Sequence, residues 1–106
     1  MDSIIRGTNA TIQIKIKEVL DFSTITALEL HIYQPPHPIV KTLPDLTLDA
    51  SERTVTYEMT QAESLSLVAG RSVEISLIGV ADGKRFEARP VIIAKVENTR
   101  KDEVIT

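Results

Sequence analysis

Hydrophobic and polar residues alternate with a period of two along most of the chain. Such alternation places successive side chains on opposite faces of a pleated strand. The pattern is clearest in three runs, at residues 11–17, 26–33 and 53–59. Each run has one apolar and one polar face, which predicts antiparallel strands with one side in water.

A hairpin is predicted where the run 71–80 meets a second long run, 84–96. The connecting pair, Asp82-Gly83, readily adopts the positive φ angles of a type I′ turn. Gly79 and Pro90 lie inside these runs, and glycine has no side chain to pack while proline has no N–H. We therefore expect a bulge or an unpaired edge at these two positions, where the strands bend or change sheets.

Shorter elements fill the middle of the chain. The proline-rich stretch 34–38 predicts a loop, and Ile39-Val40 after it predicts an edge strand. Residues 46–49 are expected to pair with 53–59 as a hairpin. The sequence 60–63, Thr-Gln-Ala-Glu, matches a capping box and predicts a helix of one to two turns that ends by Gly70 and covers an open end of the core.

About seven short strands in a chain of 106 residues predict an immunoglobulin-like sandwich of antiparallel sheets with one short helix. A chain of this length forms a single domain, 1–106. Its last segment, 97–106, is charged and then apolar at Val104-Ile105. We expect it to be a flexible tail or to add an edge strand, here or on a neighbouring molecule.

Composition narrows the functional classes. The net charge is −3, from 15 acidic and 12 basic residues scattered along the chain, so the basic cluster that a phosphate backbone requires is missing. We therefore expect no nucleic-acid partner. No stretch reaches the ~20 apolar residues of a membrane span, and the amino-terminal residues lack the features of a secretory signal. We expect no membrane partner and folding in the cytoplasm.

Candidate chemistry is sparse. Cysteine is absent, which removes disulfides and thiolate ligands, and His31 and His37 form no metal-ligand pattern with nearby carboxylates. Asp45 and Asp49 would share one face of a strand, about 13 Å apart, too far to share a proton or a cation.

The remaining carboxylates and hydroxyls add no site. Glu52 or Glu63 would not complete a recognised calcium loop. The serines lack a nucleophile elbow, and the four separated glycines form no phosphate loop. We expect no catalytic residue, metal or cofactor. An enzyme would require His31 to cluster with carboxylates in one concave pocket.

A carbohydrate-binding sandwich is an open alternative, because such modules stack sugars on exposed aromatic rings. Only four aromatic residues occur, and Tyr33 is the one that the alternation places on a polar face. Tyr57 and Phe86 fall on faces assigned to the core. A sugar platform would therefore consist of a single ring.

The order of several short motifs resembles a family of small phage and prophage proteins, and also the amino-terminal domain of phage upper baseplate proteins. The motifs are Ile5-Arg6-Gly7-Thr8, Thr11-Ile12-Gln13-Ile14, Asp21-Phe22-Ser23-Thr24-Ile25-Thr26-Ala27-Leu28, Leu48-Asp49, the strand 54–59, Thr60-Gln61-Ala62-Glu63, Gly70 before Val73-Glu74-Ile75, and Asp82-Gly83. The resemblance implies a non-catalytic virion or tail-associated structural module that meets other virion proteins, or further copies of itself through sheet edges. It also implies assembly in the host cytoplasm and a final location in the virion.

Overall fold

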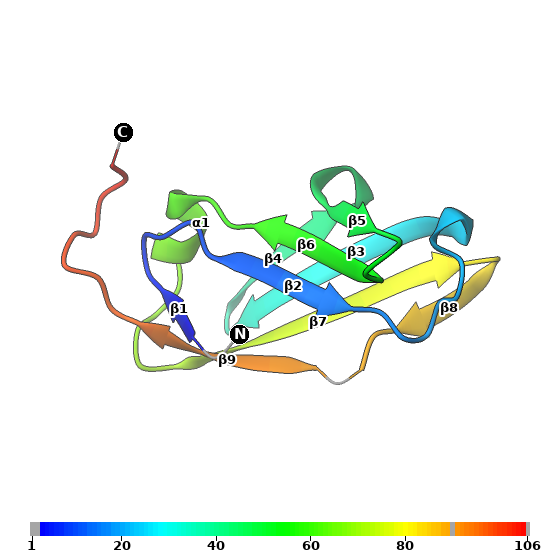
Figure 1. The fold of residues 1–106 in the computed structure, drawn as a ribbon. Coiled ribbons are helices and arrows are strands. Elements are labelled where there is room, and N and C mark those ends of the chain that lie inside the picture. The colour runs from blue at the N-terminus through cyan, green and yellow to red at the C-terminus, as the bar shows by residue number, and fades with distance from the viewer. Residues whose placement is uncertain (1–2, 90, 106) are drawn as a thin grey trace.

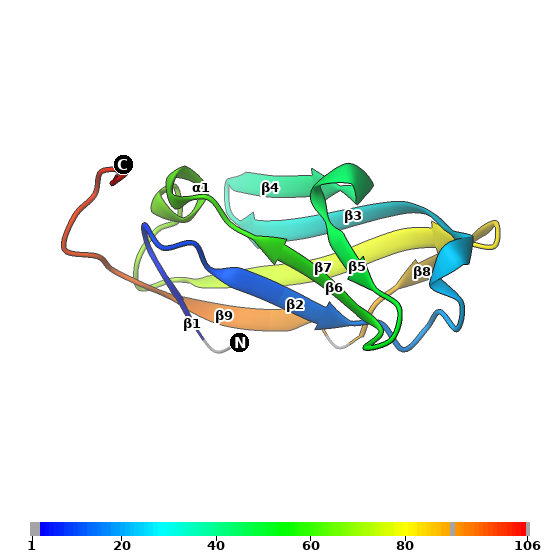
Figure 2. The same ribbon diagram turned by 45° about the horizontal axis from the view of Figure 1, so that its top comes forward.

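Two β-sheets pack face to face in the computed structural model, which describes residues 3–89 and 91–105 (Figures 1 and 2). Within these residues, the larger sheet has six strands: β1 (Ser3–Ile5), β9 (Ile92–Glu97), β7 (Ser72–Ala81), β3 (Ile25–Gln34) and β4 (His37–Thr42) in this order, with β8 (Lys84–Glu87) also beside β7. The smaller sheet has the order β2 (Thr11–Lys15), β6 (Thr54–Glu58) and β5 (Thr47–Asp49). Among the same residues, one α-helix, α1 (Gln61–Leu65), and the 3₁₀ turns η1 (Phe22–Thr24) and η2 (Leu43–Asp45) connect the strands.

The strand order confirms the predicted immunoglobulin-like sandwich with one short helix. The sheet β2-β6-β5 corresponds to strands B, E and D of that fold, and β9-β7-β3-β4 to G, F, C and C′. One pairing departs from the antiparallel prediction, because β1 lies parallel to β9 with Ile4 opposite Val96. This three-residue strand is too short for alternation to reveal it.

The core lies between the inner faces of the two sheets, as the alternation predicted. The buried side chains come from every second position: Ile12 and Ile14 of β2, Leu28, Leu30 and Ile32 of β3, Val55 of β6, and Val73, Ile75 and Leu77 of β7. Each large aliphatic side chain buried in this way contributes roughly 1.5–3 kcal/mol relative to exposure. Packing of this alternating set therefore stabilises the sandwich.

The hairpin turn is confirmed, since Asp82 and Gly83 both have positive φ, 52° and 73°. The long second run is two strands, however. β8 pairs with the end of β7 and β9 with its beginning, so that β7 has two successive partners in the same sheet. Pro90, where a break was predicted, lies outside the described residues.

Gly79 is not a bulge, contrary to the prediction. It pairs with Leu28 on one side and Phe86 on the other, and the irregularity of the β3–β7 ladder lies between Ile25 and Ala27 instead. Glycine is required at position 79 because atoms of neighbouring strands lie too close to leave room for a Cβ atom. A Cβ atom at position 79 would lie 2.6 Å from the carbonyl oxygen of Ala27 and 2.8 Å from Cε1 of Phe86.

The predicted edge strand is confirmed as β4, but the predicted loop before it is shorter than expected. Only Pro35 and Pro36 form the turn, and β4 already begins at His37. The edge strand tolerates Pro38 because an outward N–H is not needed there. The proline-rich composition therefore marked a strand edge as well as a loop.

Helix α1 has the predicted capping box and lies at one end of the sandwich (Figure 1). The hydroxyl of Thr60 accepts the N–H of Glu63 at 3.1 Å, and the Glu63 carboxylate accepts the N–H of Thr60 at 2.9 Å. The helix ends at Leu65, earlier than Gly70, whose φ of +82° instead serves the turn into β7. No helix within the described residues is long and apolar enough to cross a membrane.

Candidate functional site

His31 lies beside one carboxylate, that of Glu29, and both residues line a hollow of about 300 Å³ together with Arg85. Nε2 of His31 lies 3.0 Å from Oε1 of Glu29 on the same strand. His37 opens β4, and its side chain is not among those the structure describes. In the described ranges, no three histidine or carboxylate side chains gather in a way that could hold a metal ion.

Asp45 and Asp49 do not share a strand, so the expected common face is wrong. Asp45 ends η2, whereas β5 begins only at Thr47. Asp49 accepts hydrogen bonds from the Ser51 hydroxyl at 2.7 Å and from the N–H groups of Ser51 and Glu52, and these bonds lower its pKa. Both carboxylates therefore stabilise turns by accepting hydrogen bonds from nearby backbone N–H groups.

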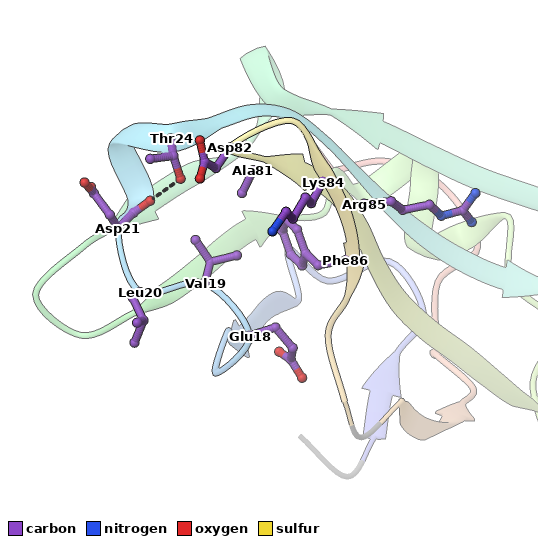
Figure 3. Close-up of a pocket in the computed structure, with 10 residues that line it drawn as sticks. All are labelled: Glu18, Val19, Leu20, Asp21, Thr24, Ala81, Asp82, Lys84, Arg85 and Phe86. Atoms are coloured by element: carbon purple, nitrogen blue, oxygen red, sulfur yellow. Dashed lines mark hydrogen bonds between the residues drawn. The ribbon is translucent and has the colours of Figure 1, made fainter.

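A hollow of about 530 Å³ lies at the end of the sandwich opposite α1 (Figure 3). One wall is the segment before and within η1, and the other is the β7–β8 hairpin. The lining residues are Glu18, Val19, Leu20, Asp21, Thr24, Ala81, Asp82, Lys84, Arg85 and Phe86. This volume falls in the range of sites that hold a small ligand or a few side chains.

Hydrogen bonds hold the two walls of the hollow together. Asp21 accepts the N–H and the hydroxyl of Ser23, which lowers the pKa of Asp21 and fixes the start of η1. The N–H of Asp82 donates to the carbonyl of Thr24 at 3.0 Å. The Glu18 carboxylate accepts the N–H of Arg89 at 3.2 Å.

The chemistry of the hollow suits binding. Val19 is buried, Phe86 is partly buried, and Leu20 at the rim is 90% exposed. The charged lining carries both signs, and it includes no histidine or cysteine that could exchange protons near neutral pH. An apolar side chain flanked by charges is the kind of group that fits this arrangement.

The outer face of the larger sheet offers a smaller hollow of about 250 Å³. Tyr33 and Ile93 flank it and are 44% and 68% exposed. Tyr57 and Phe86 pack against the core, as predicted. Tyr33 is therefore the exposed ring that the alternation indicated.

A cluster of polar residues joins β4, β6 and the start of α1. Within this Glu63 cluster (Lys41, Tyr57, Thr60 and Glu63), Nζ of Lys41 lies 2.6 Å from Oε2 of Glu63, and the Tyr57 hydroxyl donates to Oε1 at 2.6 Å. Burial, together with the neighbouring Glu63 carboxylate, raises the pKa of Tyr57. The sequence indicated only the capping role of Glu63, because β4, β6 and α1 meet here solely through the fold.

Arg6 fastens the carboxyl-terminal segment to the domain. Its guanidinium donates to Asn98 at 2.8 Å, to Asp102 at 3.0 Å and to the carbonyl of Leu65 at 2.9 Å. The Gln61 side chain exchanges two hydrogen bonds with the backbone of Ile105. Residues 98–105 form no strand within this chain, and addition to a neighbour stays a prediction.

Comparison with known proteins shows the fold. No protein-family model matches the chain, and no curated protein matches it. Among solved structures, the chain is similar to the endo-beta-1,4-mannanase from Thermotoga petrophila, with 19% sequence identity and a TM-score of 0.54. The match covers 93% of this chain and 18% of that one, so the chain spans less than a fifth of the mannanase.

Proposed function

We propose that this chain is a non-catalytic structural module of a phage or prophage particle and works through contacts with other virion proteins. The motif order in the sequence supports the particle, and the described residues hold no group of three histidine or carboxylate side chains that could bind a metal ion. The observation that carries the assembly role is the open edge of β2.

In the described residues, β2 is an edge strand of the smaller sheet, because β1 pairs with β9 in the larger sheet. In a constant-type immunoglobulin sandwich, strand A pairs with strand B, whereas β1 pairs with β9 here. The N–H of Met59 donates to the carbonyl of Ala10, and the N–H of Ile16 donates to the carbonyl of Arg53. The backbone N–H and C=O groups of the even-numbered residues along β2 therefore point toward β6. The N–H and C=O groups of Thr11, Gln13 and Lys15 therefore point away from the sheet and can pair with an added strand.

The opposite edge of the sandwich is better protected. Proline has no N–H to give β3, so Pro38 takes an outward position on β4, and the same parity turns Val40 and Thr42 outward. The carboxylate of Asp45 accepts the N–H of Thr42 at 3.4 Å. Proline and a capped amide are devices that keep strands from adding to an edge.

Proline substitutions at the two edges test the proposal. Gln13→Pro removes an outward N–H from β2, and Val40→Pro removes one from β4 as the matched control. Particles released by prophage induction are purified from strains encoding the chain or either variant, and the chain is quantified by mass spectrometry. We expect the unchanged chain and Val40→Pro in the particles, and Gln13→Pro reduced at least about tenfold, a loss of about 1.4 kcal/mol.

Circular dichroism of the two purified variants tests whether both still fold, as we expect. Absence of the unchanged chain from the particles would overturn the virion role. Equal incorporation of a folded Gln13→Pro variant would show that the β2 edge is not the contact.

The alternative function is a carbohydrate-binding module, favoured by the exposed ring of Tyr33 beside the hollow of about 250 Å³. The similar structure is named as an endo-beta-1,4-mannanase, so manno-oligosaccharides are the appropriate probe. Calorimetric binding that Tyr33→Ala abolishes would favour this alternative over the structural role.

A further inference from the structure

The open edge of β2 lies in a segment whose polarity is symmetric about Gln13. In residues 9–17, Asn-Ala-Thr-Ile-Gln-Ile-Lys-Ile-Lys, polar residues occupy every odd position and apolar residues every even one. The odd positions are exposed, whereas Ile12, Ile14 and Ile16 are buried. An antiparallel copy of the segment, related by a two-fold axis at Gln13, therefore places apolar side chains beside apolar ones and polar side chains beside polar ones.

The backbone of β2 determines which residues of two paired copies face each other. The N–H and C=O groups of the odd positions point away from β6. A two-fold axis at Gln13 places Gln13 opposite Gln13 of the second copy, and Thr11 opposite its Lys15. Residues that face each other in this way exchange two N–H···O bonds, with their Cα atoms about 5.5 Å apart. Every outward N–H and C=O group of β2 then has a partner.

Strand length and charge favour this register over the others that pair odd positions. Shifting the axis toward the carboxyl end brings Lys15 of one copy toward Lys15 of the other, and like charges that face each other are destabilising. Shifting it toward the amino end pairs Lys15 with Asn9 or Gly7, which lie outside β2. The axis at Gln13 pairs the whole of β2 and separates the two Lys15 positions by about 14 Å.

The same register places Lys15 at the level of an opposite charge. Glu58 of β6 lies opposite Thr11, and the Gln13 amide donates to the Thr56 hydroxyl at 3.5 Å, so these residues share the outer face of the sheet. Lys15 of the second copy, beyond Thr11, lies two strand spacings from Glu58, about 10 Å between backbones, which the two long side chains span. Among the ion pairs of the described residues, neither Lys15 nor Glu58 takes part.

The carboxyl-terminal segment of the same chain does not occupy this edge. Residues 98–105 form no strand, and Arg6 and Gln61 hold them near α1. Figure 1 shows the segment leading away from β2 beyond the α1 end of the sandwich. The edge is therefore left for another molecule.

We propose that the β2 strands of two copies pair antiparallel about Gln13. The two smaller sheets then become one continuous sheet with the order β5-β6-β2-β2-β6-β5. Such a contact is isologous and closes after two copies. The inference rests on the proposed structural role and deepens it, because it names a second copy of the chain as the partner at the β2 edge.

Disulfide trapping tests the pairing, because the chain has no cysteine of its own. Gln13→Cys places two thiols on the two-fold axis, at a Cα separation within disulfide range. Thr47→Cys, exposed on β5 at the opposite edge of the same sheet, is the matched control. After mild oxidation of both variants at one concentration, we expect at least about tenfold more covalent dimer from Gln13→Cys. Equal yields would overturn the proposal.

A mixture of two further variants tests the register. Thr11→Cys and Lys15→Cys should give little covalent dimer when each is oxidised alone. They should form a mixed dimer when oxidised together, identified by mass spectrometry, because position 11 faces position 15 of the other copy. Cross-linking of Thr11→Cys alone as strongly as in the mixture would overturn the register.

Light scattering after size exclusion measures association without a covalent bond. We expect dimers of the unchanged chain and of Val40→Pro up to millimolar concentration. Gln13→Pro should dimerise at least about tenfold more weakly, because it removes the N–H groups on the two-fold axis. A Gln13→Pro variant that folds by circular dichroism and dimerises as well as the unchanged chain would overturn the β2 contact.

Failure of this inference is distinct from failure of the structural role. An unchanged chain that stays monomeric, but enters purified particles in which Gln13→Pro is depleted, would overturn the dimer and leave the role standing. The strand added to β2 would then come from another virion protein. Absence of the unchanged chain from the particles would overturn the role itself.

Discussion

Replacing Gly79 with alanine should lower the free energy of unfolding by about 3 kcal/mol. The added Cβ would lie 2.6 Å from the carbonyl oxygen of Ala27, 2.7 Å from Cδ2 of Leu28 and 2.8 Å from Cε1 of Phe86. A side chain could rotate away, but the Ala27 oxygen belongs to the backbone of β3. Urea denaturation measures the loss, and the melting temperature should fall by roughly 12–24 °C for a domain of this size.

Gly70→Ala is the matched control for this prediction. Position 70 has no atom within 4 Å of an added Cβ, but its φ is +82°. The same substitution there should cost only the left-handed backbone strain of a non-glycine residue, about 1 kcal/mol. If Gly79→Ala proves as mild as Gly70→Ala, close approach is not the reason for glycine at position 79.

Alternation predicted the long strands because it is a local property of the sequence. Strands β2, β3 and β7 bury every second residue over most of their length, and β6 buries Val55 and packs Tyr57 against the core, so their own residues carry the signal. Alternation did not predict features that depend on contacts between segments far apart in the sequence. The three residues of β1 are too few to show a period, and Gly79 is explained by Phe86 on the neighbouring strand rather than by its own segment.

The candidate sites were beyond the reach of local patterns for the same reason. The hollow has Leu20 on one wall and Lys84 on the other, although these residues lie far apart in the sequence. Its one local signal is the apolar Leu20 in a segment between two strands, where no core face requires it. Likewise, the sequence predicted Glu63 as part of a capping box, but only the fold brings Lys41 and Tyr57 to its carboxylate.

Removing the carboxylate with Glu63→Ala should destabilise the protein by about 3 kcal/mol. The side chain is only 16% exposed and accepts hydrogen bonds from Lys41, Tyr57 and the N–H of Thr60. Its loss leaves the ammonium group and the hydroxyl without their partner and removes half of the capping box. Exposed Glu58 on β6 provides the control, since Glu58→Ala should change stability by at most about 0.5 kcal/mol.

The contribution of Glu63 should depend on pH in a defined direction. Burial alone would raise the pKa of Glu63, but the hydrogen bonds from Lys41, Thr60 and Tyr57 outweigh it and hold the pKa below its ordinary value. A lowered pKa in the folded state means that the stability is fully present above the unfolded value, about 4.3, and is lost as pH falls through the folded value.

The difference in unfolding free energy between the unchanged protein and Glu63→Gln measures this dependence. The Glu63 carboxylate raises the pKa of Lys41 in the folded protein, so the contribution of the lysine is present below its ordinary pKa of about 10.4 and declines only as pH rises further. The difference should therefore stay constant between about pH 6 and 9 and shrink below about pH 4. A difference that persists undiminished at pH 3 would mean that the charge of Glu63 is not what joins β4, β6 and α1.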